Sequence, residues 1–245
     1  MHSKYKKYNS QIFEWLPIFI VMGMLLPEAL AAPSGPQIVL NSTDYGPSGS
    51  STIINTSGGT ISTINLYGIT QNIRWKAFIG NVSGKLTLTD SGSYSIYDWR
   101  ITTVSGEVYA SRFNSIDWAS ISCAQDANIT AEEAALNMTH SSDDSISNTF
   151  SVKVHRKFYV GSKLIQNSTC YSTATFVGNQ SQEISESMKF QEVLLAQADK
   201  LVYASLLENR SVGYNNQNFD FQMLVPDYGV PTGSSVPYYL YVELI

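Results

Sequence analysis

Charged side chains are scarce in this sequence, where they make up 14% of 245 residues, against about 25% in an ordinary soluble domain. Acidic residues outnumber basic residues by 20 to 15, so the formal net charge is −5. Nucleic acids and anionic membranes are bound by basic surfaces, which this composition does not supply. We therefore expect neither as a partner.

Residues that carry catalysis are also few. The chain has three histidines, and we find no G-x-S-x-G elbow, no Ser-x-x-Lys, no H-E-x-x-H and no glycine-rich phosphate loop. Of the histidines beyond residue 31, His140 lies in a polar run and His155 lies in a basic cluster. The sequence predicts a protein that is not an enzyme and that carries no cofactor.

A calcium site is the one metal hypothesis that the acidic residues raise. Asp143 and Asp144, with Asp126 or Asp90, could offer oxygen ligands from loops. Their spacing matches no known calcium loop, and a solvated turn is the favoured interpretation. We predict no metal.

Long apolar runs are missing except near the amino terminus. Three lysines in the first seven residues precede the apolar stretch Trp15–Leu26, and small residues follow at Ala29-Leu30-Ala31. This order is typical of a secretory signal peptide over residues 1–31. An uncleaved anchor is the alternative, although a spanning helix needs about 20 apolar residues. Cleavage would change the formal charge from −5 to −6, because three lysines and two glutamates leave. We expect a secreted, extracellular chain without a membrane span.

N-x-S/T sequons are more frequent than chance predicts, at eight against about three for random placement. Ser/Thr-rich loops can generate single sequons incidentally, but the set favours N-glycosylation. Each modified asparagine must face solvent. The predicted sites are Asn41, Asn55, Asn81, Asn128, Asn137, Asn167, Asn179 and Asn209.

Two cysteines, Cys123 and Cys170, are present. An even number in an exported chain predicts a disulfide. Zinc ligation is the weaker alternative, since two cysteines 47 positions apart with no histidine spacing match no zinc pattern.

Short alternating runs dominate from Thr60 onward and predict strands. We expect about ten strands in one all-β domain, residues 60–245, resembling a sandwich or jelly roll. A Thr130/Glu133 capping box predicts one short helix over 130–137. Two hairpins are expected, one over 84–98 and one formed by 190–196 with 201–207. The other expected strands are 62–67, 74–79, 107–111, 149–155, 158–164, 173–177, 219–225 and 239–244.

Residues 32–59 read as an N-terminal strand on a flexible linker rich in Ser, Gly and Thr. Ile38, Val39 and Leu40 form a strand-sized apolar piece that a neighbouring subunit could accept. Near the other end of the sequence, Tyr239 and Tyr241 alternate with aliphatic residues and form a possible contact patch. Cover by a second sheet or a glycan is the equally weighted alternative.

Five segments resemble a group of exported archaeal cell-surface proteins, and the similarity covers most of residues 59–245. These segments are RWKAFIGNVSG (74–84), YDW (97–99), GEVYASR (106–112), FDFQMLVP (219–226) and YYLYVELI (238–245). That group has no assigned enzymatic activity, so the resemblance implies an archaeal surface role and transfers no catalytic residue. One departure is the turn 197–200, which lacks the glycine expected there.

Two hypotheses of different classes follow. The first is a glycosylated structural subunit of an extracellular filament or surface coat, which self-associates by strand addition. The second is a surface adhesin or glycan-binding module that binds other surface proteins or glycans through the tyrosine strand or the Asn-rich loop near Asn215.

Overall fold

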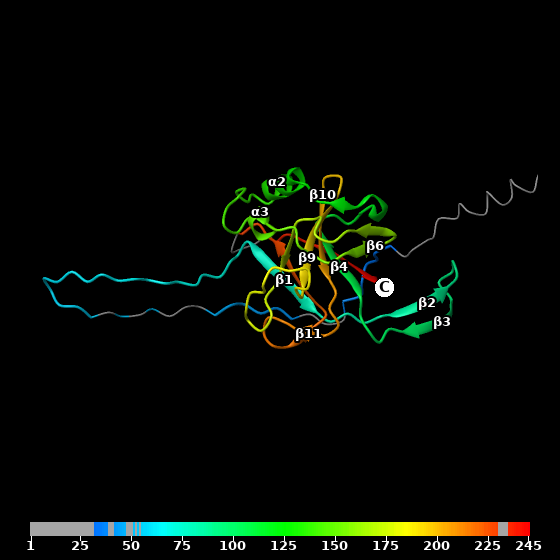
Figure 1. The fold of residues 1–245 in the computed structure, drawn as a ribbon, viewed down its shortest axis with the longest axis horizontal. Coiled ribbons are helices and arrows are strands. Elements are labelled where there is room, and N and C mark those ends of the chain that lie inside the picture. Colours follow the sequence, from blue (N-terminus) through cyan, green and yellow to red (C-terminus); the bar gives the residue numbers. More distant parts are fainter. Residues whose placement is uncertain (1–31, 39–41, 48–50, 52, 54, 230–234) are drawn as a thin grey trace, which may run out of the picture.

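The computed structural model describes residues 32–38, 42–47, 51, 53, 55–229 and 235–245. The predicted signal peptide, Val39, Leu40 and the sequon at Asn41 lie outside these residues. The described chain is mostly β-strand, so the predicted all-β single domain is confirmed (Figure 1).

A six-stranded antiparallel sheet forms the centre of the molecule. Its order is β14-β4-β10-β9-β5, and β8 also pairs with β9. The strands span Gly106–Ser111 (β4), Ser122–Cys123 (β5), Ser172–Ala174 (β8), Gln191–Gln197 (β9), Lys200–Leu206 (β10) and Tyr239–Leu244 (β14).

The central strands are buried on both faces. In β9, Leu194 belongs to one hydrophobic cluster and Leu195 belongs to a second cluster on the opposite face. In β10, Tyr203 belongs to the first cluster and Val202 belongs to the second. A strand with both faces covered needs apolar residues at successive positions, which explains the unbroken apolar run in β9.

Different elements cover the two faces. The first face packs against the helices α2 (Asp126–Ala135) and α3 (Ile146–Thr149) and the antiparallel pair β1 (Trp75–Gly80) and β13 (Phe221–Pro226). The second face is covered by the hairpin β6–β7 and the short 3-10 helix η1. Their bounds, with those of a small peripheral pair, are η1 Trp118–Ser120, β6 Phe158–Val160, β7 Lys163–Ile165, β11 Ser211–Val212 and β12 Asn218–Phe219.

The disulfide between Cys123 and Cys170 is present, as predicted. It ties β5 to the loop before β8. His155 holds the same loop, because its Nε2 accepts hydrogen bonds from the backbone N–H groups of Thr169 (3.1 Å) and Cys170 (3.0 Å). Burial lowers the pKa of His155, which favours the neutral ring that can accept these bonds.

The predicted helix begins earlier than expected. A short helix is present, but the predicted bounds 130–137 and the Thr130 cap are wrong, because α2 starts at Asp126 and Thr130 lies within it. The box is one turn upstream, where Asn128 Oδ1 accepts a hydrogen bond from the backbone N–H of Gln125 (2.9 Å). Asparagine can satisfy a free N–H at a helix start.

Two predicted strands are absent. Within 149–155 the backbone makes a single bridge, between Val152 and Ser172. Residues 60–72 contain no strand and are exposed throughout. A strand requires a neighbour to pair with its N–H and C=O groups. The described segment 42–47 runs beside this stretch, where Gly46 lies against the Gln71 side chain, but within the described ranges no backbone hydrogen bond joins residues 60–72 to another segment. We call residues 55–73 the arm, which extends far from the body (Figure 1).

Candidate assembly surface

The outer edge of β14 is the first element of the candidate surface. β14 pairs with β4 along one side only. On its other side, Val242 N–H donates to the Ser34 carbonyl (2.8 Å) and Ser34 N–H donates to the Val242 carbonyl (3.1 Å). The segment before the arm therefore approaches β14 as a short antiparallel strand.

Most of that edge is unfilled. In an antiparallel ladder alternate residues direct their polar backbone groups to the same side, so Leu240 and Leu244 present theirs beside those of Val242. Within the described part of the chain, neither residue has a backbone partner on that side. The edge can accept a longer strand than the single bridge at Ser34.

The bridge within one copy does not involve the described residue of the predicted assembly strand. Of the predicted assembly strand, Ile38 is 68% exposed, and Val39 and Leu40 lie outside the described residues. The pairing residue is Ser34, four positions earlier. Pro33, beside it, is buried. Neither residue carries an apolar strand pattern, so periodicity gave no signal for this bridge.

The predicted tyrosine patch is divided by the structure. Tyr239 is 45% exposed, whereas the Tyr241 ring packs edge-on against Trp118 with centroids 5.1 Å apart. The Tyr241 hydroxyl donates to the Phe113 carbonyl (3.1 Å). Tyr241 is thus partly covered by its own chain, and Tyr239 is the more accessible ring.

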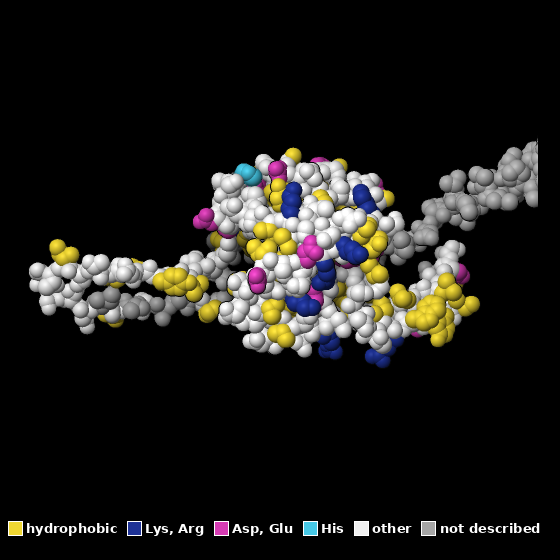
Figure 2. All heavy atoms as spheres, viewed as in Figure 1, with side chains coloured by type: hydrophobic (Ala, Val, Ile, Leu, Met, Phe, Trp, Pro, Cys, Tyr) yellow, Lys and Arg dark blue, Asp and Glu magenta, His cyan; other side chains and the backbone are white. Residues whose placement is uncertain are grey.

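The hairpin of β2 (Lys85–Thr89) and β3 (Ser95–Arg100) confirms the predicted 84–98 hairpin, and every residue in its strands is exposed. Leu86 lies opposite Trp99, and Leu88 lies opposite Tyr97. These four side chains share one face. Figure 2 shows hydrophobic side chains gathered on this projecting hairpin. An amphipathic hairpin thus stands apart from both core clusters.

The arm is the third element, and it contains the end of the predicted linker (55–59) and the predicted strand 62–67. It contains no charged residue, and Ile61, Leu66 and Ile69 are nearly fully exposed. At its base, Asn72 Nδ2 donates to Asp144 Oδ2 (3.2 Å). Trp75 Nε1 donates to the Asp144 carbonyl (2.7 Å). Asp144, a candidate calcium ligand, therefore anchors the arm to the loop before α3.

Two carboxylates are buried behind the β14 edge. Glu243 is the cross-strand partner of Glu107 and accepts hydrogen bonds from the Tyr109 hydroxyl (2.9 Å) and from Gly161 N–H (2.9 and 3.1 Å). Glu107 Oε2 is buried and has no hydrogen-bond partner among the described residues. Burial, and secondarily the charge of Glu243, raise the pKa of Glu107 well above its usual range. Burial also raises the pKa of Glu243.

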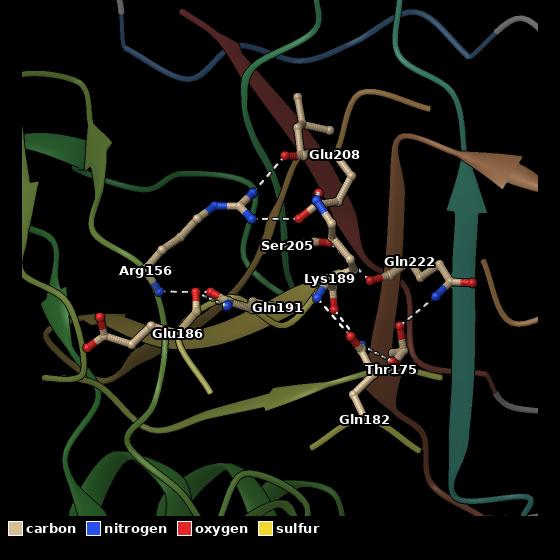
Figure 3. A network of polar contacts seen from close by, with 10 residues as sticks. Arg156, Thr175, Gln182, Glu186, Lys189, Gln191, Ser205, Glu208 and Gln222 are labelled. Carbon is tan, nitrogen blue, oxygen red and sulfur yellow. Dashed lines mark hydrogen bonds and ion pairs between the residues drawn. The ribbon is translucent and has the colours of Figure 1, made fainter. Parts of the chain in front are cut away.

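The most extensive polar cluster that we describe fixes the ends of β9, β10 and β13 (Figure 3). Glu208 accepts bonds from Arg156 Nη1 (2.5 Å) and Lys189 Nζ (3.0 Å). Arg156 N–H donates to Gln191 Oε1 (2.8 Å), and Gln222 Nε2 donates to Thr175 Oγ1 (2.7 Å). These groups satisfy one another, and we assign the cluster a structural role.

No group of three or more His, Cys, Asp or Glu side chains within the described ranges could hold a metal ion.

The sequons that can be placed differ in exposure. Six asparagines are exposed: Asn55, Asn81, Asn137, Asn167, Asn179 and Asn209. Asn128 is the exception, because it lies in α2 with its side chain engaged. Its Nδ2 donates to the Ala198 carbonyl (2.7 Å) while its Oδ1 caps Gln125. The glycan acceptor nitrogen of Asn128 is therefore already occupied by a structural contact. The acceptor nitrogen of Asn167, although exposed, also donates to a protein group, Glu186 Oε1 (2.7 Å).

Comparison with known proteins adds no relative. No protein-family model, curated protein or solved structure matches the chain. None of the helices in the described part is long and apolar enough to cross a membrane. Function must therefore be argued from the β14 edge, the arm and the hairpin.

Proposed function

We propose that the chain is a secreted, N-glycosylated cell-surface structural protein that self-assembles into a filament or coat by strand addition. The acceptor is the outer edge of β14, and the donor is the segment 32–38 of another copy. The bridge between Ser34 and Val242 is the observation that carries the proposal. One copy makes this pairing within itself, and two copies could make the same pairing between them if the segment 32–38 of each added to β14 of the other.

The connection between donor and body permits this exchange. Ser34 is joined to β1 at Trp75 by about 40 residues, which span at most roughly 130 Å when extended. A long connection lowers the effective concentration of the internal donor. A neighbouring copy then competes for the same edge, as in domain swapping.

The character of the edge also supports the proposal. Natural proteins guard exposed sheet edges with lysine, proline or bulges. The six residues of β14 include neither lysine nor proline, and their one charged side chain, Glu243, is buried. An unguarded edge suits a protein that uses it for pairing.

Exposed sequons and low charge fit an extracellular location. Six placed asparagines are exposed, and sugars would keep a sparsely charged surface hydrated. The disulfide is of the kind that persists in oxidising compartments. The archaeal surface role implied by the resemblance is part of the same proposal.

Negative-stain electron microscopy of the full chain purified from its native surface tests the proposal. We expect filaments or sheets, and mass spectrometry should find Ala32 as the first residue and glycans on exposed asparagines. Discrete small particles would overturn the structural role and favour an adhesin or glycan-binding module.

Two variants test the mechanism. Deleting residues 32–38, or changing Leu240→Pro, should prevent ordered assembly while near-UV circular dichroism is retained. Proline fits an edge position whose N–H faces away from the sheet, so the body should fold. Scrambling the sequence of 42–47 is the matched control and should leave assembly intact. Filaments of native length from the 32–38 deletion would refute strand addition at β14.

A further inference from the structure

The β2–β3 hairpin and the arm are each incomplete in one copy. A two-stranded sheet is marginally stable alone, and a third strand or a packed face is needed for independent stability. Both outer edges of the hairpin are unpaired among the described residues. Its apolar face, Leu86, Leu88, Tyr97 and Trp99, is exposed to solvent.

The arm has the complementary deficiency. Ile64 and Leu66 lie two positions apart and share a face when the segment is extended. The segment 61–69 is exposed and forms no strand. It therefore has strand-like alternation, and its backbone groups form no ladder with any other described segment.

We infer that residues 61–69 of one copy add as a third strand to an open edge of the β2–β3 hairpin of a second copy. The pair Ile64 and Leu66 would lie beside Leu86 and Leu88 or beside Tyr97 and Trp99, which have the same two-residue spacing. This inference rests on the proposed assembly function and assigns it a second contact.

The positions of the two segments favour a second copy over the same copy. The arm joins β1 at Trp75, and the hairpin follows the other end of β1, after Gly80. Figure 1 shows the arm and the hairpin on opposite sides of the body. A contact between opposite ends of identical copies is head-to-tail, and such contacts build open filaments when the rotation does not close.

The hairpin also continues from the proposed acceptor edge. A Cβ atom at Gly84 would lie 2.5 Å from Leu244 Cδ1, so the base of the hairpin touches the end of β14. Both acceptor surfaces therefore lie together, and both donor segments lie in the first 73 residues. One copy can engage its neighbour at both places at once.

Charge favours a polypeptide occupant. The arm is uncharged, so its approach meets no repulsion. The polar face of the hairpin carries Lys85 paired with Asp98 (2.6 Å), along with Arg100 near one end and Asp90 in the turn. Such a balanced set gives little attraction to an anionic lipid surface. The apolar face includes two leucines, which offer no hydrogen bonds to a sugar.

The contact is smaller than a standard interface of about 1,600 Å², so it should be tested in assembled full-length protein. Two variants, Leu66→Cys and Leu88→Cys, each add one cysteine to a chain whose native cysteines are paired, and they would be mixed and oxidised gently. A disulfide between them is intermolecular by construction. We expect a cross-linked heterodimer several-fold above the level for either variant alone. Asn65→Cys mixed with Leu88→Cys is the matched control, because Asn65 lies on the other face of the arm.

The outcomes separate this inference from the proposed function. Filaments without excess cross-linking would overturn the inference and leave the structural role standing. Cross-linking in small particles that never polymerise would support the contact and refute the filament. Efficient intramolecular cross-linking in a monomeric Leu66→Cys/Leu88→Cys double variant would overturn the second copy as occupant. The second copy would also be overturned as occupant if no cross-link formed and the protein bound liposomes or glycans in a way that the double variant Leu88→Thr/Trp99→Thr abolished.

Discussion

The chain contains two hairpins of similar size whose environments are opposite. β9–β10 is buried on both faces, whereas every residue of β2–β3 is exposed. Their sequences already differ, since Val193–Ala196 is continuously apolar and Lys85–Thr89 alternates strictly. Continuous runs belong to doubly covered strands and alternation to strands with one covered face. The alternating hairpin lacks the cover that its pattern predicts, which is why we assign it a partner.

The largest stability effect should come from the covalent link beside β9. Replacing Cys123 and Cys170 by alanine should lower the free energy of unfolding by roughly 4 kcal/mol, because a closed loop of this length restricts the unfolded chain. Urea unfolding monitored by circular dichroism measures the change. A loss below about 1 kcal/mol would contradict the expectation.

A pair of leucine substitutions compares the hairpins directly. Leu195→Ala in β9 should cost about 3 kcal/mol, since it opens a cavity in a core where Leu195 is fully buried. Leu88→Ala in β2 should change the stability of the monomer by less than about 0.5 kcal/mol. Thermal and urea unfolding at concentrations below assembly would measure both. Equal losses would show that the hairpin is buried in the isolated protein.

The buried Glu107 predicts a pH dependence of the free energy of unfolding. Because its pKa is raised in the folded state, the folded chain binds a proton that the unfolded chain releases near pH 4.3. Its stabilising contribution is complete below that pH and is lost as the pH rises through the folded-state pKa.

Glu107→Gln should therefore reduce the loss of unfolding free energy as the pH rises, so that the variant is more stable than the native chain at pH 8. Glu183→Gln, an exposed site, is the matched control and should follow the native profile. Parallel native and Glu107→Gln profiles from pH 4 to pH 9 would contradict the assigned proton.

The smallest effect is expected at a sequon that supports the β9–β10 turn. Asn128→Ala removes the cap at Gln125 and the bond to Ala198, and should cost about 1 kcal/mol. Asn55→Ala, in the exposed arm, should be neutral. Glycopeptide mass spectrometry should find Asn55 modified and Asn128 unmodified. Full occupancy at Asn128 would mean that the asparagine is glycosylated before α2 forms its contacts.

The β9–β10 turn at Ala198 is supported by a hydrogen bond from a residue that is distant in the sequence. The sequence predicted the β9–β10 hairpin but questioned its turn, which lacks glycine. Ala198 adopts a positive φ of 54°, a conformation that costs energy for a residue with a Cβ. Asn128, seventy positions away, donates to its carbonyl. Sequence spacing could not bring these residues together.

The sequence by itself determined the all-β class, the two hairpins and the pairing of its two cysteines, because side-chain alternation, turn residues and cysteine number act locally or leave no alternative. Only the tertiary structure decided which strands are covered, where α2 begins and which residue pairs with β14. Those outcomes depend on contacts such as Ser34 with Val242 and Tyr241 with Trp118, whose energies are set by packing between distant segments.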